Sequence, residues 1–310
     1  MHRRLYTSLP PWCSFVGVTC NTNSTSTTYA SVTNITLDGH HLNGSIPNSI
    51  GSLSALTTLT LSANILYGSI PVGFSLMTSL QYLHLNSNLF TGSIPTNFGI
   101  LTSLSSMYLE SNRFTGNIPD LRLLGLLTVL LLSNNQLSGA IFSSIGSLSL
   151  LSDLAVNNNL LTGSIPSSIG LLVAAVHVDF SFNQLTGSLP SAIGMMGSLQ
   201  ELLLSSNTLM GTIPTSLSNL GNLMHLDLSS NYLTMGSAHI VPTSTFSSYT
   251  LSNSQSGNKL DLSQNCLVFS YGVISVNATH CSPTSSKSTA ILCNLSKFSW
   301  HLPRSEIHDF

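Results

Sequence analysis

The sequence contains very little charge. Only 6% of its 310 residues are Asp, Glu, Lys or Arg, against about 25% in ordinary globular proteins, so solubility must depend on Ser, Thr and Asn. With eight Lys and Arg and a net charge of −2, the chain lacks the clustered basic residues that a nucleic-acid-binding surface requires. Nucleic acid is therefore excluded as a partner.

Long apolar runs are also missing. A membrane-spanning helix needs a run of about 18 apolar residues or more, and the nearest candidate, residues 121–132, is shorter and contains Arg122. That segment lies in register with the repeat described below, so we interpret it as core. The amino terminus has Arg3 and Arg4 but no apolar segment after them, which is not a competent signal peptide.

An asparagine recurs with a nearly constant spacing along most of the chain. Successive steps are 24 residues, with one step of 23, and the asparagines are Asn64, Asn88, Asn112, Asn135, Asn159, Asn183, Asn207 and Asn231. His40 holds the same place one period earlier, and Asn265 holds it after a gap of 34 residues, which makes ten repeats. A period of 20–29 residues with the pattern L-x-x-L-x-L-x-x-N is typical of leucine-rich repeats.

Apolar residues precede each asparagine by eight, five and three positions, as Leu80, Leu83 and Leu85 precede Asn88. The last two alternate with polar residues, which predicts a short strand with one buried face. Stacked repeats would place these strands in a parallel sheet, since no repeat can bury its leucines alone. The asparagine amide is expected to bond buried backbone groups of its own and the neighbouring repeat.

In eight repeats a glycine follows the asparagine, or His40 in its place, by four positions, and a proline follows by seven in most of these repeats. The glycines, which predict a tight backbone position, are Gly44, Gly68, Gly92, Gly116, Gly139, Gly163, Gly187 and Gly211. The proline cannot donate a hydrogen bond and suits the start of a new segment; Phe142 replaces it once, and the 23-residue step is a deletion after Pro119.

The L-x-G-x-I-P segment resembles the plant-type leucine-rich repeat of receptor-kinase ectodomains, receptor-like proteins and polygalacturonase-inhibiting proteins. The resemblance covers roughly residues 12–281 and implies an α/β repeat fold: a solenoid with a concave parallel β-sheet and an irregular or 3-10 helical convex side. We expect a partial amino-terminal cap over 1–31 and a solenoid with its carboxy-terminal cap over 32–281. Within the solenoid, residues 235–256 form an insert, read as a surface loop or a loop that contacts ligand. An irregular tail follows over 282–310.

The resemblance also implies how the five cysteines are used. Cys13 and Cys20 resemble the end of the plant-type amino-terminal cap, and Cys266 and Cys281 bracket the last strand as in carboxy-terminal caps. Disulfides Cys13–Cys20 and Cys266–Cys281 are therefore expected, with Cys293 unpaired. The alternatives are metal binding or reduced thiols.

Caps of this kind fit an oxidising compartment, and so do five N-x-S/T glycosylation motifs. These motifs begin at Asn23, Asn34, Asn43, Asn277 and Asn294. We expect an extracellular or cell-surface protein whose leader peptide is missing from this chain. The alternative is a leaderless cytosolic protein with reduced cysteines.

The strand residues between the leucines would point to the concave face, at positions six, four and two before each asparagine. Seven of the ten acidic residues fall in these three columns, but only one of the eight Lys and Arg does. Composition alone would scatter the charge, so this bias is the main functional signal. The competing interpretation is that the carboxylates only provide solubility and block association.

Two patches of this face are candidate ligand-binding sites. The front patch consists of Tyr82, His84, Tyr108 and Glu110, whose aromatic rings beside a carboxylate suit a peptide backbone or a glycan. The rear patch is acidic and contains histidine: Asp153, His177, Asp179, Glu201, His225 and Asp227. The tyrosines are alternatively read as tolerated surface residues.

Neither metal binding nor catalysis is expected. His177 and His225 would lie two strands apart, about 9.6 Å at a strand spacing of about 4.8 Å, whereas zinc ligands lie about 2 Å from the metal. The carboxylates would lie on an open sheet without a closed pocket to raise a pKa, and no catalytic motif or cofactor-binding motif is present.

The sequence therefore favours a non-catalytic recognition module that resembles a receptor ectodomain, with a protein, a peptide or a glycan as partner. The alternatives are a secreted inhibitor of cell-wall-degrading enzymes, similar to polygalacturonase-inhibiting proteins, and a structural wall protein.

Overall fold

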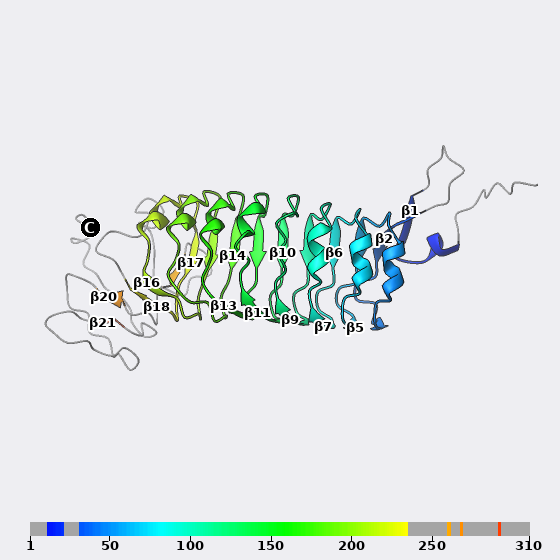
Figure 1. Ribbon diagram of the computed structural model, residues 1–310, viewed down its shortest axis with the longest axis horizontal. Helices are drawn as coiled ribbons and strands as arrows, with labels where there is room; N and C mark the ends of the chain where they lie inside the picture. Colours follow the sequence, from blue (N-terminus) through cyan, green and yellow to red (C-terminus); the bar gives the residue numbers. More distant parts are fainter. Residues whose placement is uncertain (1–10, 22–30, 235–258, 262–266, 269–290, 293–310) are drawn as a thin grey trace, which may run out of the picture. The chain divides into compact units, whose positions relative to one another are not determined.

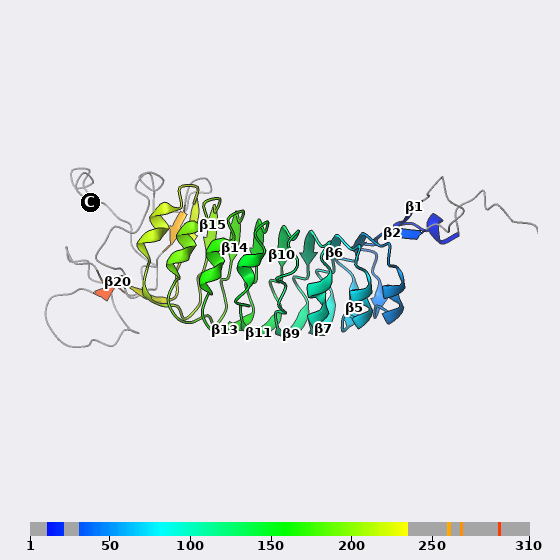
Figure 2. The ribbon, with the colours of Figure 1, turned by 45° about the horizontal axis from the view of Figure 1, so that its top comes forward.

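The computed structural model describes residues 11–21, 31–234, 259–261, 267–268 and 291–292. The chain divides into an N-terminal unit, Met1–Ser138, and a C-terminal unit, Gly139–Phe310. Each unit is a leucine-rich repeat solenoid in which short strands recur in every described repeat and a short 3-10 helix recurs in most of them (Figures 1 and 2).

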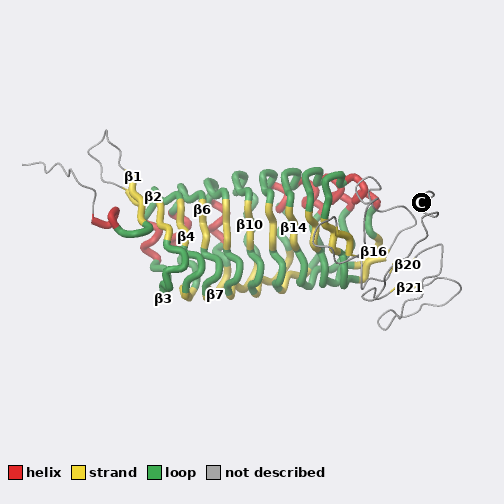
Figure 3. Tube along the Cα trace, turned by 180° about the vertical axis from the view of Figure 1, so that it is seen from behind, coloured by secondary structure: helices red, strands yellow, loops and turns green. Residues whose placement is uncertain are grey.

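The strands between the leucines form a main sheet in each unit, as predicted. In the N-terminal unit they are β1 (Val18–Asn21), β2 (Ser31–Thr36), β4 (Thr58–Thr60), β6 (Tyr82–His84), β8 (Ser106–Tyr108) and β10 (Val129–Leu131). In the C-terminal unit they are β12 (Asp153–Ala155), β14 (His177–Asp179), β15 (Glu201–Leu203), β17 (His225–Asp227) and β19 (Lys259–Asp261). Figure 3 shows the first of these strands side by side. All described pairs of these main-sheet strands are parallel except β1 with β2, which is antiparallel.

The leucines of the repeat form the core. Leu80, Leu83 and Leu85 have no exposed surface, and Leu223 and Leu228 are equally buried. The segment 121–132 also belongs to the core, although Leu123 and Leu126 point to solvent; its buried leucines, two or three residues apart, are Leu121, Leu124, Leu127, Leu130 and Leu132. No helix among the described residues is long and apolar enough to cross a membrane.

The asparagine ladder is confirmed in both units. Asn88 accepts a hydrogen bond on Oδ1 from the Leu66 amide (3.0 Å), and its Nδ2 donates to the carbonyls of Leu61 (2.9 Å) and Leu85 (3.1 Å). Each amide thus satisfies backbone groups of its own repeat and of the preceding one. His40 does not take part in this way, because it is exposed and its Nδ1 contacts the carbonyl of Asp38 (2.8 Å).

The repeat proline precedes a new segment, the 3-10 helix, as the sequence predicts. Pro71 is the N-cap residue of η3 with an extended backbone, and five other repeat prolines cap a 3-10 helix in the same way. The N-terminal unit contains η1 (Pro11–Ser14), η2 (Asn48–Ser52), η3 (Val72–Leu76) and η4 (Thr96–Ile100); the C-terminal unit contains η5 (Ile145–Ser147), η6 (Ser167–Leu171), η7 (Ser191–Met195) and η8 (Thr215–Asn219). The shortened repeat after Pro119 has turns instead of a helix before β10.

A second sheet was not expected from the sequence. Its strands follow the asparagines, and most of them contain the repeat glycine, which has positive φ in all eight repeats. In the N-terminal unit they are β3 (Asn43–Gly44), β5 (Ile65–Gly68), β7 (Leu89–Ser93), β9 (Arg113–Asn117) and β11 (Gln136–Ala140). In the C-terminal unit β16 (Met210–Thr212) pairs with β18 (Tyr232–Thr234), and β13 (Leu160–Thr162) is followed by a bridge between Ser164 and Thr186.

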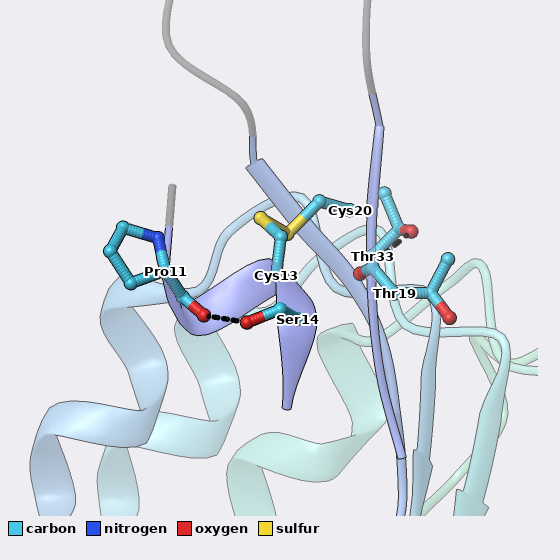
Figure 4. The surroundings of a disulfide bond; sticks show 6 residues. All are labelled: Pro11, Cys13, Ser14, Thr19, Cys20 and Thr33. Carbon is cyan, nitrogen blue, oxygen red and sulfur yellow. Dashed lines mark hydrogen bonds between the residues drawn. A yellow bond between two sulfur atoms is a disulfide. The ribbon is translucent and has the colours of Figure 1, made fainter. Parts of the chain in front are cut away.

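The amino-terminal cap contains the expected disulfide. Cys13 in η1 and Cys20 in β1 are joined, with Cα atoms 5.6 Å apart (Figure 4). Thr33 Oγ1 donates to the Thr19 carbonyl and helps to hold β1 against β2. Cys266, Cys281 and Cys293 lie outside the described residues, as do the whole predicted insert over 235–256 and all of the tail except β21 (Ile291–Leu292), which pairs antiparallel with β20 (Leu267–Val268).

Candidate functional site

The front patch lies on the outward face of β6 and β8 in the N-terminal unit. Tyr82 and His84 flank the buried Leu83, so both side chains point away from the core, and Tyr82 is 42% exposed. His84 pairs in register with Tyr108, and the two rings stack with centroids 4.1 Å apart and planes 19° apart. The sequence placed these residues on adjacent strands, and the structure shows that two of them form a single aromatic platform.

Burial controls the ionisation of the front patch. Burial lowers the pKa of His84 below 6.5, against the opposing effect of Asp38, and its Nε2 lies 2.9 Å from Ser106 Oγ. Burial also raises the pKa of Glu110, opposed by a backbone hydrogen bond. Within the described part of the chain, Oε2 of Glu110 is buried without a hydrogen-bond partner, and so is Oγ1 of Thr60, which pairs in register with His84. The His84 imidazole is therefore neutral at neutral pH.

The first row of the rear patch crosses four parallel strands of the C-terminal unit. The register aligns Asp153, His177, Glu201 and His225 on β12, β14, β15 and β17. Glu201 lies between the two histidines: its Oε1 is 2.6 Å from Nδ1 of His225 and its Oε2 is 3.3 Å from Nδ1 of His177. Both imidazoles therefore turn toward the same carboxylate, an arrangement that the sequence columns did not reveal.

The second row contains Asp179 and Asp227, on either side of Leu203. Oδ1 of Asp179 accepts hydrogen bonds from the backbone amide (2.9 Å) and the hydroxyl (2.6 Å) of Ser181. In the same way, Oδ1 of Asp227 accepts a hydrogen bond from the backbone amide of Ser229, two residues later (2.9 Å). Burial raises the pKa of Asp179, the bonds from Ser181 lower it, and Glu201 and Asp227 raise it further. Each of the four strands thus carries one outward carboxylate, alternating between the two rows.

The described residues contain no group of three or more His, Cys, Asp or Glu side chains that could hold a metal ion. His177 and His225 each contact Glu201, so their Nδ1 atoms are already engaged. Sequence reasoning missed the serines that complete the patches, Ser106 and Ser181, because Ser is so common here that its position carries no signal.

The chain matches the family model described as Leucine Rich Repeat at residues 79–101, 126–148, 176–196 and 198–220. No curated protein matches it. Among solved structures it is similar to the ectodomain of the plant membrane receptor kinase GASSHO1/SCHENGEN3 from Arabidopsis thaliana in complex with CASPARIAN STRIP INTEGRITY FACTOR 2, with 37% identity over 62% of this chain and a TM-score of 0.62.

Two further structures are similar. The plant peptide hormone receptor RGFR1 in complex with RGF2 shares 38% identity over 62% of this chain, with a TM-score of 0.61. A plant ice-binding protein shares 27% identity over 72% of this chain, with a TM-score of 0.58. This chain spans 23% and 31% of the two receptor chains, but 71% of the ice-binding protein.

Proposed function

Because the chain belongs to the plant-type leucine-rich repeat proteins, we propose that it is an extracellular or cell-surface recognition module that binds a peptide or protein and performs no catalysis. Two of the similar ectodomains were solved with the named partners CASPARIAN STRIP INTEGRITY FACTOR 2 and RGF2, which supports ligand recognition. The ligand lies on the outward, concave face of the main sheet.

The observation that carries this proposal is the distribution of charge. A chain with only ten acidic residues has one outward carboxylate on each of β12, β14, β15 and β17. Complementary potential between partners sets the rate and specificity of association. The rear patch therefore suits a basic segment of a partner. Taken by itself, the neutral aromatic platform of the front patch suits an uncharged segment, either peptide backbone or glycan.

A matched pair of double variants tests the rear patch. Binding of secreted basic peptides is measured by calorimetry for Asp179→Asn/Asp227→Asn and for Asp120→Asn/Glu306→Gln, which removes the same charge outside the three outward columns. We expect at least a tenfold loss of affinity in the first variant only, and weaker binding by the wild type as salt rises, because ions screen exposed charges. Equal affinities in the two variants would show that the carboxylates provide only solubility.

A second candidate function, ice binding, is favoured by the second sheet and by the similarity to the plant ice-binding protein over most of both chains. Exposed hydroxyl side chains recur there around the repeat glycine. In the C-terminal unit they are Thr162 and Ser164, then Thr186 and Ser188. Parallel strands lie about 4.8 Å apart, and the bridge places Ser164 beside Thr186, so exposed hydroxyls of neighbouring repeats form a nearly uncharged grid.

Ice recrystallisation assays distinguish the two candidates. Thr162→Tyr/Thr186→Tyr would disturb the grid, whereas Asp179→Asn/Asp227→Asn leaves it intact. If this sheet binds ice, inhibition of recrystallisation is lost in the first variant and kept in the second. A wild-type protein without any effect on ice growth would exclude this function and leave peptide recognition unaffected.

A further inference from the structure

Of the five glycosylation motifs, two lie among the described residues, and their surroundings differ. Asn34 is in β2, between β1 and β4, and pairs in register with Thr19 and Thr58; its side chain is half-buried. Asn43 is in β3, the last strand of its sheet, and is exposed, as is Ser45 of the same motif. The fold therefore leaves more room for a glycan at Asn43 than at Asn34.

The space beside Asn43 is open. A Cβ atom added at Gly44 would meet no atom within 4 Å, whereas one added at the equivalent Gly68 would touch the Cβ atom of Ser45 in the preceding repeat (3.5 Å). No described strand pairs with the outer side of β3. Unpaired edge strands invite association with other chains, and proteins generally protect them with charge, proline or a covering group.

The neighbouring strand exposes two large apolar side chains. Asn43 pairs in register with Ile65 of β5, so both point to the same face, and Tyr67 follows two residues later. Ile65 is 44% and Tyr67 is 51% exposed. Other repeats mostly have a polar residue at Tyr67's position, such as Thr91 and Thr115, so the apolar pair occurs beside the glycosylation motif and the open edge.

We propose that Asn43 is an N-glycosylation site whose inner sugars cover Ile65 and Tyr67 and block the outer edge of β3. Sugar rings have apolar C–H faces that can pack on a tyrosine ring while their hydroxyls stay in water. Tyrosine suits such a contact because its ring is apolar and its hydroxyl is polar. This inference depends on the extracellular location proposed above. The glycan would supply the polar bulk that this nearly uncharged surface otherwise lacks.

The test uses the full chain, secreted from a eukaryotic host behind an added leader, so that its outcome does not depend on the natural location. Enzymatic deglycosylation in H₂¹⁸O followed by peptide mass spectrometry gives the occupancy of each motif. We expect Asn43 to be modified in most molecules and Asn34 in a clearly smaller fraction. An unmodified Asn43 in molecules glycosylated elsewhere would overturn the proposal, whatever the ligand of the main sheet proves to be.

Variants test the protective role. Ser45→Ala removes the glycan but keeps Asn43, and Thr36→Ala removes only the Asn34 motif. We expect concentration-dependent association by light scattering in Ser45→Ala but not in Thr36→Ala, and its suppression in Ser45→Ala/Ile65→Gln/Tyr67→Thr. Monomeric Ser45→Ala with unchanged binding of a hydrophobic dye would refute the covering of Ile65 and Tyr67.

Discussion

Replacing Asn183 by alanine should destabilise the C-terminal unit severely. Its Oδ1 is the acceptor for the buried Leu161 amide (3.0 Å), and its Nδ2 donates to the carbonyls of Val156, Phe180 and Ser181 (each 3.1 Å). A buried donor left without a partner costs about 1–3 kcal/mol. With about 1 kcal/mol for each of two buried carbonyls, we expect a loss of about 3–5 kcal/mol in the free energy of unfolding.

Urea unfolding followed by circular dichroism measures this loss, and amide exchange locates it. Because repeats interact mainly with their neighbours, the Leu161 amide should lose protection while amides of the N-terminal unit keep theirs. Gln184→Ala is the control, since that neighbouring side chain is exposed and such changes usually alter stability by less than about 0.5 kcal/mol. If both variants unfolded at the same urea concentration, the ladder would not be a stabilising element.

Three other predictions concern single residues. Gly187→Ala should destabilise the fold by about 1 kcal/mol or more in the same urea assay, because Gly187 has φ of 77° and an added Cβ would lie 3.3 Å from that of Ser164, a conformation that costs L-residues about 1–2 kcal/mol. Asp179→Asn should stabilise the protein at neutral pH, because burial raises the folded-state pKa of Asp179 above 3.8. The wild type therefore loses stability as pH rises from the unfolded-state pKa to the folded-state pKa, and urea midpoints between pH 3 and 7 should fall less in the variant. His84 should titrate below pH 6.5 by NMR. Because protonation of a buried imidazole is unfavourable, the stability of the protein should fall as pH drops below 6.5, and His84→Phe should reduce that loss.

The main sheet and the ladder could be predicted because both depend on a spacing that the sequence repeats. Leu83, Leu85 and Asn88 recur at 24 residues, and stacking turns this period into columns whose outward positions follow directly. The second sheet could not be predicted in the same way. In Thr91-Gly92-Ser93 a central glycine replaces the buried side chain, and the alternation is too short to indicate a strand.

The contacts within the patches could be predicted only in part. The columns place His177, Glu201 and His225 on neighbouring strands, but whether both imidazoles turn toward the carboxylate depends on side-chain rotamers. The burial of Glu110 depends on the bulk of the side chains around it, which periodicity does not describe. Sequence reasoning therefore located the patches and missed their internal bonding.

The repeat between Asn112 and Asn135 is one residue shorter than its neighbours and has turns where they have a 3-10 helix. Nevertheless, Asn135 Oδ1 accepts from the Phe114 amide at 3.0 Å, the same distance as between Asn112 and the Phe90 amide. The asparagine ladder thus keeps its geometry when the segment after the proline loses a residue. Over evolutionary time, insertions and deletions after the proline can accumulate without altering the register of the outward columns, so the two faces of such a chain can diverge at different rates.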